Sequence, residues 1–316
     1  PYSGVSVVVP QHVKAQEKYA EVALINILNQ DVNGVKNQFC YGKRFKIEML
    51  PEPFNNPDIV IFHQVFYLQY VLIAEQLKRK SIPYIIVPHG CLSRDALQIK
   101  WLKKKVAMQL IFERYIKKAV ALQCLSENEK ADIAWNIDKF VATNGMFVGE
   151  EKKEKFNLKN IKLLYIGRLD VYHKGLDFLL DAVQKAKSAF EKLDAHLDIL
   201  GPDVDDIHMT LRRMVEERGI SDIVTVAGAI HGLDKRNKLL DADLFIQTSR
   251  FEGMPMGILE ALSYGVPCIV TEGTTLGTYI CKYNAGWKTD NNSDSIAEVL
   301  KQALHNVMTY SQKSEG

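Results

Sequence analysis

Segment 248–262 places two glutamates around the predicted start of a helix. A buried strand is predicted to end near Thr248, and a helix is predicted to begin at Pro255, because proline suits the first helical turn. Glu252 then lies in the loop and Glu260 lies in the helix. Backbone N–H groups at a helix start can bind an anion. Here they belong to Met254, Met256 and Gly257. The segment therefore predicts a phosphate site between two carboxylates that could accept hydrogen bonds from sugar hydroxyls.

A second segment, 167–175, carries two cationic side chains after another predicted buried strand. Gly167 allows a tight backbone turn, and Arg168 and Lys174 follow it. Both could bind one diphosphate, arginine as a planar fork and lysine as a point charge. Taken singly, such residues are more often solvated surface groups. Glu260 is harder to explain in that way, because a carboxylate among apolar neighbours usually has a specific partner.

Predicted strands and helices alternate along the chain, so these residues would follow strands of a parallel sheet. The predicted strands are 5–9, 45–50, 58–62, 84–87, 121–125, 140–143, 161–166, 196–200, 223–227, 243–248 and 267–271. The predicted helices are 16–29, 67–80, 97–118, 127–135, 176–187, 206–218, 234–240, 257–264 and 293–307. The pattern predicts an α/β protein with two doubly wound parallel-sheet domains.

A run of charged residues at 150–155 interrupts this alternation, and we interpret it as the linker between two domains. The domains are then 1–148 and 149–316. In such sheets ligands bind at the carboxyl ends of the strands. The residues that follow the strands are therefore expected to face a cleft between the domains.

Together these segments resemble the family-4 retaining glycosyltransferases of the two-Rossmann GT-B type. The resemblance rests on G-R-x5-K-G at 167–175, on the E-x7-E spacing of Glu252 and Glu260, and on Ala-Leu-Ser-Tyr-Gly-Val-Pro at 261–267. Pro-His-Gly at 88–90 and Thr-Asn-Gly at 143–145 match the first domain of the same group. The resemblance implies an enzyme that transfers a hexosyl unit from a nucleotide sugar to a glycan or lipid-linked acceptor, with retention of configuration and without a metal ion. Such transfer would belong to cell-surface polysaccharide synthesis. A UDP-sugar donor is favoured, and a GDP-sugar is the alternative.

The resemblance also implies roles for single residues. Arg168 and Lys174 would bind the donor diphosphate, with the backbone at Met254, Met256 and Gly257. Glu260 would hold the ribose hydroxyls, and Glu252 would contact the transferred sugar. His89 would face that sugar from the first domain. The nucleobase would lie against Ala229, Ile230 and His231.

Charge and cysteine content indicate which partners and which cellular compartment to expect for this protein. The formal net charge is +2, with a mildly basic first half and an acidic second half, and this pattern does not predict a nucleic-acid partner. Five cysteines without C-x-x-C spacing argue against a zinc site and a disulfide framework. They favour a reducing compartment, so we expect the protein to be cytoplasmic. The resemblance implies an enzyme with no metal and no cofactor beyond its nucleotide-sugar substrate.

Other interpretations stay open at this point. The basic, amphipathic segment Lys100–Lys118 is either an ordinary surface helix or a peripheral contact with the inner face of a membrane. The first domain lacks the Gly-Gly pair common in the family, and His12 and Lys14 could take its place. The same architecture is also found in nucleotide-sugar epimerases and hydrolases, so the protein could be one of these enzymes. It could also be a catalytically silent protein that binds a sugar nucleotide.

Overall fold

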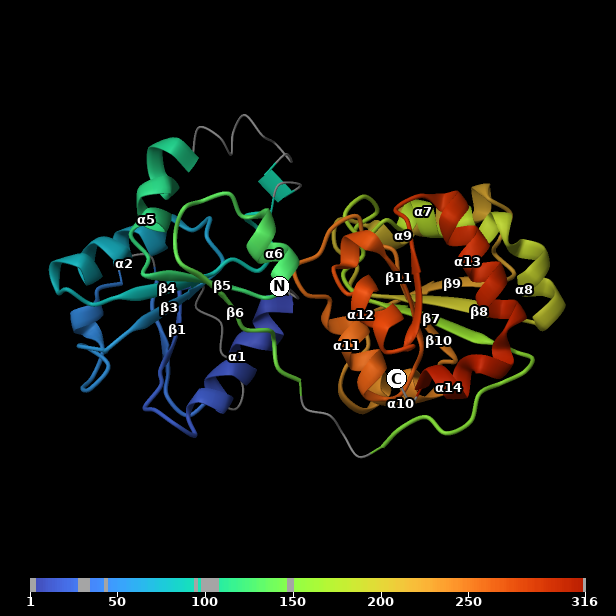
Figure 1. Ribbon diagram of the computed structural model, residues 1–316, viewed down its shortest axis with the longest axis horizontal. Coiled ribbons are helices and arrows are strands. Elements are labelled where there is room, and N and C mark those ends of the chain that lie inside the picture. The colour runs from blue at the N-terminus through green and yellow to red at the C-terminus, as the bar shows by residue number, and fades with distance from the viewer. Residues whose placement is uncertain are drawn as a thin grey trace. The chain divides into compact units, whose positions relative to one another are not determined.

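The computed structural model describes residues 4–27, 35–42, 45–93, 96–97, 108–146 and 151–314. It divides the chain into two compact units, Ser3–Gly145 and Met146–Gly316 (Figure 1). Each unit has parallel sheets and its own hydrophobic core. The predicted α/β class is therefore confirmed.

In the N-terminal unit, the described strands of the main sheet lie in the order β3 (Val60–His63), β4 (Tyr84–Val87), β5 (Ala121–Cys124) and β6 (Lys139–Val141). A separate parallel pair consists of β1 (Leu24–Asn26) and β2 (Gln38–Cys40). The helices are α1 (Gly4–Gln16), α2 (Leu68–Arg79), α5 (Glu113–Lys117) and α6 (Glu127–Asp132), with the short 3-10 helix η1 (Ile47–Met49) and the π-helix η2 (Met108–Phe112). Of the predicted helix 97–118, residues 98–107 lie outside the described residues.

The predicted strand 5–9 is wrong, because these residues lie in α1. Val5, Val8, Val9 and Val13 recur with the spacing of one helix face, and Val8 and Val13 are buried. A short apolar run fits a strand and a helix equally well until its continuation is considered. In this segment helical periodicity outweighs the β-propensity of valine.

Two further predictions in the first fifty residues are also wrong. The predicted helix 16–29 is replaced by the end of α1 and by strand β1, which pairs with β2 from Leu24 opposite Gln38. That partner is distant in the sequence, so local periodicity could not reveal it. The predicted strand 45–50 forms η1, and Ile47 and Leu50 are both buried, as the three-residue period of a tight helix requires.

In the C-terminal unit, the described strands form one parallel sheet in the order β12-β11-β10-β7-β8-β9. Their bounds are β7 (Lys162–Ile166), β8 (His196–Leu200), β9 (Val224–Ala227), β10 (Leu244–Gln247), β11 (Cys268–Thr271) and β12 (Gly286–Thr289). The helices are α7 (Leu176–Lys185), α8 (Lys187–Leu193), α9 (Ile207–Glu217), α10 (Gly232–Asp241), α11 (Met256–Ser263), α12 (Gly277–Lys282), α13 (Ser293–His305) and α14 (Tyr310–Ser314), with short turns at Glu272–Thr274 and Val307–Thr309. Sequence reasoning missed α8, α12, β12 and α14.

Helices cover both faces of this sheet because its strands are apolar on both faces. On β7, Leu163 and Tyr165 enter the core beneath α7, α8, α9 and α13, whereas Leu164 enters the core beneath α10, α11 and α12. The chain winds from β7 outward to β9 and then returns to β10 on the other side of β7. The carboxyl ends of β7 and β10 therefore meet at the switch point of the sheet, where α/β proteins bind ligands.

A buried ion pair attaches the segment before β7 to the C-terminal unit. Lys153 and Asp243 have side chains that are 6% and 0% exposed, and Lys153 Nζ lies 3.1 Å from Asp243 Oδ1. Asp243 also accepts hydrogen bonds from the backbone N–H groups of Asn157 and Lys162. The described part of the predicted linker, 151–155, has no regular secondary structure. It is nevertheless fixed to the C-terminal sheet.

Candidate active site

The two motifs of the C-terminal unit meet at the switch point. Strands β7 and β10 pair directly, with Leu163 opposite Leu244, so the loops that follow them are neighbours. The loop after β7 carries Arg168 and Lys174, and the loop after β10 carries Glu252. Residues separated by about eighty positions in the sequence are in this way brought into contact.

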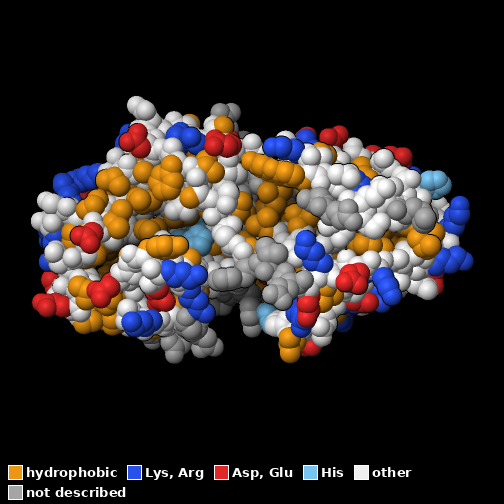
Figure 2. Space-filling view, turned by 60° about the horizontal axis from the view of Figure 1, so that its bottom comes forward, with side chains coloured by type: hydrophobic (Ala, Val, Ile, Leu, Met, Phe, Trp, Pro, Cys, Tyr) orange, Lys and Arg blue, Asp and Glu red, His pale blue; other side chains and the backbone are white. Residues whose placement is uncertain are grey.

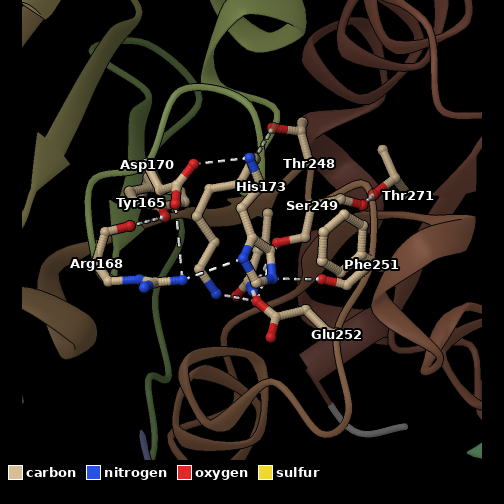
Figure 3. A network of polar contacts seen from close by, with 11 residues as sticks. Tyr165, Arg168, Asp170, His173, Thr248, Ser249, Phe251, Glu252 and Thr271 are labelled. Atoms are coloured by element: carbon tan, nitrogen blue, oxygen red, sulfur yellow. Dashed lines mark hydrogen bonds and ion pairs between the residues drawn. The ribbon is translucent and has the colours of Figure 1, made fainter. Parts of the chain in front are cut away.

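Glu252 lies at the centre of a polar network (Figure 3). Its Oε1 atom forms an ion pair with Lys174 and accepts hydrogen bonds from Gln247 Nε2 at 2.9 Å and Ser249 Oγ at 3.1 Å. The lysine and glutamate side chains are each only 13% exposed. No described residue donates a hydrogen bond to Oε2 of Glu252, and Figure 3 shows this oxygen pointing away from the network. One carboxylate oxygen is therefore left for a ligand hydroxyl.

Gly175 allows the two loops to come this close. It has a left-handed φ of 61°, and a Cβ atom at this position would lie 2.1 Å from the carbonyl oxygen of Thr248. Thr248 Oγ1 also donates to the carbonyl oxygens of Lys174 and Gly175, at 3.1 and 3.0 Å. The glycine of the K-G pair thus sets the position of the preceding lysine.

Arg168 is held by a histidine that the sequence motifs did not single out. Its Nη2 atom donates to His173 Nδ1 at 3.1 Å, and His173 Nε2 lies 3.0 Å from the carbonyl oxygen of Phe251. Arginine only donates and a carbonyl only accepts, so the contacts require a neutral imidazole with its proton on Nε2. Burial lowers the pKa of His173, which favours the same form. The guanidinium is about half exposed and accessible to an anion.

Helix α11 begins beside these side chains. Pro255 caps the helix, Met256 and Gly257 form its first turn, and Met254 lies in the loop before it. A Cβ atom on Gly257 would lie 3.0 Å from the carbonyl oxygen of Ile166, at the end of β7. The positive end of the α11 dipole is therefore close to the loop that carries Arg168.

Glu260, in the middle of α11, forms an ion pair with Lys235 of the neighbouring helix α10. His231 caps α10, and its carbonyl oxygen accepts from the Lys235 N–H at 3.4 Å. The predicted nucleobase loop therefore lies next to the predicted ribose residue. Within that loop Ala229 is exposed, and Ile230 packs on the core beneath α10 and α11.

His89 lies in the N-terminal unit, in a turn after β4 with a left-handed φ of 53°. Its Nε2 atom lies 3.0 Å from Nδ1 of His63, which ends the adjacent strand β3. The ring of His12 is 5.9 Å from that of His63. Burial, with a smaller effect of nearby His12, lowers the pKa of His89 to about 4. Burial, followed by the neighbouring histidines, lowers the pKa of His63 to about 3.

A buried carboxylate supports the backbone next to His89. Glu129 on α6 accepts hydrogen bonds from the N–H groups of Gly90 and Leu125, both at 2.6 Å. Its own N–H donates to Ser126 Oγ, which caps α6. Burial raises the pKa of Glu129, whereas the two backbone donors oppose that shift. Glu129 thus links the turns that follow β4 and β5.

Sequence reasoning missed several polar residues that complete these networks. Gln247 and Ser249 flank the predicted strand end, His173 lies inside the G-R-x5-K-G motif, and His63 and Glu129 surround His89. A polar side chain at the end of an apolar strand was the available signal for Gln247 and His63. Among the described residues, no group of three or more His, Cys, Asp or Glu side chains is arranged to bind a metal ion. No helix in the described ranges is long and apolar enough to span a membrane.

The two α/β units and the polar groups at the switch point define a two-domain α/β protein with a candidate ligand site at the strand ends of its C-terminal unit. Residues 149–315 match the family described as "Glycosyl transferases group 1". The match covers more than half of the chain, and the chain belongs to this family.

Two curated relatives show the range of the likeness. The chain is 29% identical to mannosylfructose-phosphate synthase of Agrobacterium fabrum over 123 residues, covering 38% of this chain and 27% of that protein. It is 25% identical to GDP-mannose:cellobiosyl-diphosphopolyprenol alpha-mannosyltransferase of Xanthomonas campestris over 219 residues, covering 68% of this chain and 56% of that protein. The chain thus spans less than two thirds of the length of either relative.

Solved structures show the same fold over the whole chain. The Anabaena protein HepE, in complex with UDP and glucose, superposes with a TM-score of 0.75 at 15% identity, covering 99% of this chain and 89% of HepE. The predicted GT-B fold, with two Rossmann-like domains, is confirmed.

Proposed function

We propose that the protein is a retaining, metal-independent hexosyltransferase that uses a nucleotide sugar as donor. Its C-terminal unit would bind the donor, and its N-terminal unit would present the acceptor. The observation that carries the proposal is the ion pair of Lys174 with Glu252, fixed by Gln247 and Ser249 at the switch point. In this proposal the lysine would bind the diphosphate, and the free carboxylate oxygen beside it would accept a sugar hydroxyl.

The proposed chemistry is electrostatic. As the glycosidic bond to the nucleoside diphosphate breaks, negative charge grows on the leaving diphosphate. Arg168, Lys174 and the first turn of α11, at Met256 and Gly257, would stabilise that charge where it develops. Oε2 of Glu252 would accept a hydroxyl of the transferred sugar. Neutral His89 would offer the sugar a hydrogen bond from the N-terminal unit.

Two of the similar proteins support a proposal for donor and acceptor. HepE is solved with UDP and glucose, and the Xanthomonas enzyme is named for GDP-mannose and a diphosphopolyprenol-linked acceptor. By analogy we propose a UDP-sugar as the favoured donor, a GDP-sugar as the alternative, and a glycan or lipid-linked acceptor. A role in cytoplasmic synthesis of cell-surface polysaccharide is part of the same proposal.

Calorimetric titration of UDP, GDP and ADP tests the donor site, using the wild type and Glu260→Ala. We expect one nucleotide to bind selectively and the variant to lose that binding. Turnover of the matching nucleotide sugar, with and without acceptor, then tests the reaction. Consumption only with acceptor supports transfer. Conversion without acceptor would indicate an epimerase or hydrolase, and binding without any conversion would indicate a silent binding protein.

We also propose peripheral contact of the N-terminal unit with an anionic membrane. Residues 100–107 of segment Lys100–Lys118 lie outside the described residues, but η2, in its last part, packs beside α2 and carries Leu110, which is 79% exposed. Leu68 and Leu72 of α2 are exposed as well. Figure 2 shows groups of hydrophobic side chains on one face of this unit. Exposed apolar groups with lysines nearby suit the surface of an anionic bilayer.

Sedimentation with vesicles of anionic and of neutral lipid tests this contact at low salt. We expect binding to anionic vesicles only, and weaker binding for Leu110→Ser. Leu158→Ser, at an exposed leucine of the C-terminal unit, is the control and should bind as the wild type does. Absence of sedimentation with anionic vesicles would contradict the proposal.

A further inference from the structure

Lys235 has no role in the sequence motifs, yet it forms the ion pair with the carboxylate proposed to hold the ribose. The pair joins Lys235 to Oε2 of Glu260, and the side chains are 27% and 23% exposed. No described residue donates a hydrogen bond to Oε1 of Glu260. One oxygen is therefore occupied by the lysine, and the other is left for a ligand.

The two helices that carry this pair are packed together. Leu239 of α10 and Ile258 and Ala261 of α11 belong to one hydrophobic core, and Ile230 of the preceding loop packs on it. The backbone of Lys235 is also tied to His231, the cap of α10. The lysine thus extends from a fixed position beside the proposed nucleobase loop.

We propose that Lys235 is a positioning residue: it holds the Glu260 carboxylate in the orientation in which its free oxygen receives the ribose hydroxyls. The inference rests on the proposed function and adds to it a residue that selects ribonucleotides. A partly buried carboxylate without its ion-pair partner tends to rotate toward water. This rotation would remove an acceptor from the ribose hydroxyls, without touching the diphosphate site.

The test compares UDP with 2′,3′-dideoxy-UDP, and GDP with its dideoxy form, by calorimetry. Lys235→Met should weaken binding of the preferred ribonucleotide about tenfold, the usual size of one charge-assisted hydrogen bond. It should leave binding of the dideoxy form unchanged, because that ligand lacks the hydroxyls. Lys235→Arg should restore most of the affinity. Thermal unfolding of each variant shows that it folds.

Lys238→Met is the matched control. Lys238 lies on the same helix and pairs with Asp198, so the variant loses the same charge and one ion pair away from Glu260. It should bind both ligands as the wild type does. Equal weakening of both ligands by Lys235→Met, or tighter binding of the ribonucleotide, would overturn the inference.

The wild type and Glu260→Ala separate this failure from failure of the proposed function. If the wild type prefers the ribonucleotide and Glu260→Ala removes the preference, the ribose site holds. An unchanged preference in Lys235→Met would then refute only the role of the lysine. If the wild type does not distinguish the two ligands, or binds neither, the proposed ribose site itself is refuted.

Discussion

His63 and His89 make the stability of the N-terminal unit depend on pH. Their folded pKa values, about 3 and about 4, lie below the ordinary value of 6.5. At pH values between these folded pKa values and 6.5, the unfolded chain binds more protons than the folded chain does. We therefore expect the free energy of unfolding to fall as the pH falls from about 7 to about 4. The slope should be at most about 1.4 kcal/mol per pH unit for each histidine.

Urea unfolding at several pH values measures this slope. The double variant His63→Asn, His89→Asn should show a smaller slope than the wild type. His305→Asn, at an exposed histidine of α13, is the control and should leave the slope unchanged. An equal slope in the double variant and the wild type would show that the pair is not responsible.

Arg168 and Lys174 should differ in what their removal does. Each alanine variant should weaken nucleoside-diphosphate binding, by about 1.5–3 kcal/mol for each lost charged hydrogen bond. Arg168 is about half exposed, so its variant should keep the wild-type melting temperature. Lys174→Ala should also destabilise the protein, because it leaves the buried carboxylate of Glu252 without its cation. Calorimetry and thermal unfolding together check both effects, and unchanged affinity in both variants would exclude the diphosphate role.

At the scale of elements, the contact between the loops after β7 and β10 depends on Gly175. Gly175→Ala should destabilise the protein and weaken nucleotide binding, because the new Cβ would collide with the carbonyl of Thr248. Gly219→Ala is a matched control: Gly219 has the same φ of 61° but no atom within 4 Å of the added Cβ. The control should cost about 1–2 kcal/mol, and Gly175→Ala about 1–3 kcal/mol more. Equal costs would show that the close contact is not essential.

Elements could be predicted from the sequence where their signal is local. Strands β3 and β4 follow from short apolar runs, and α2 and α13 follow from helical periodicity. Strand β1 could not be predicted in this way, because its pairing with β2 depends on a distant segment. The valine run of α1 was ambiguous, since its spacing fits a helix and its composition favours a strand.

Some residues of the candidate site could likewise be predicted from the sequence, and others could not. Spacing and resemblance predicted Lys174 and Glu252 on neighbouring loops, and the structure brings them into contact. They could not predict Gln247, Lys235 or His63, whose contacts depend on packing between elements. Their residue types are common on surfaces, so only the three-dimensional arrangement distinguishes them.

At the scale of the whole molecule, the buried pair of Lys153 and Asp243 should make the segment before β7 important for stability. Lys153→Met should lower the free energy of unfolding of the C-terminal unit by about 3–5 kcal/mol, because the carboxylate of Asp243 would lose its cation in a fully buried position. Lys155→Met, at an exposed lysine two residues later, should change it by less than about 0.5 kcal/mol. Denaturant unfolding measures both, and similar values would contradict the prediction.

The same pair decides where the chain could be cut to obtain the C-terminal unit as a separate fragment. A fragment that starts at Glu151 keeps Lys153, and with it the counter-charge of Asp243 at the edge of β10. A fragment that starts at Leu158, only seven residues later, loses Lys153 and the donors on Asn157, and would enclose a carboxylate that retains only the N–H of Lys162. In the sequence, segment 151–155 looks like a dispensable charged spacer. In the structure, it supplies Lys153, which the sheet of the C-terminal unit needs as the cation for Asp243.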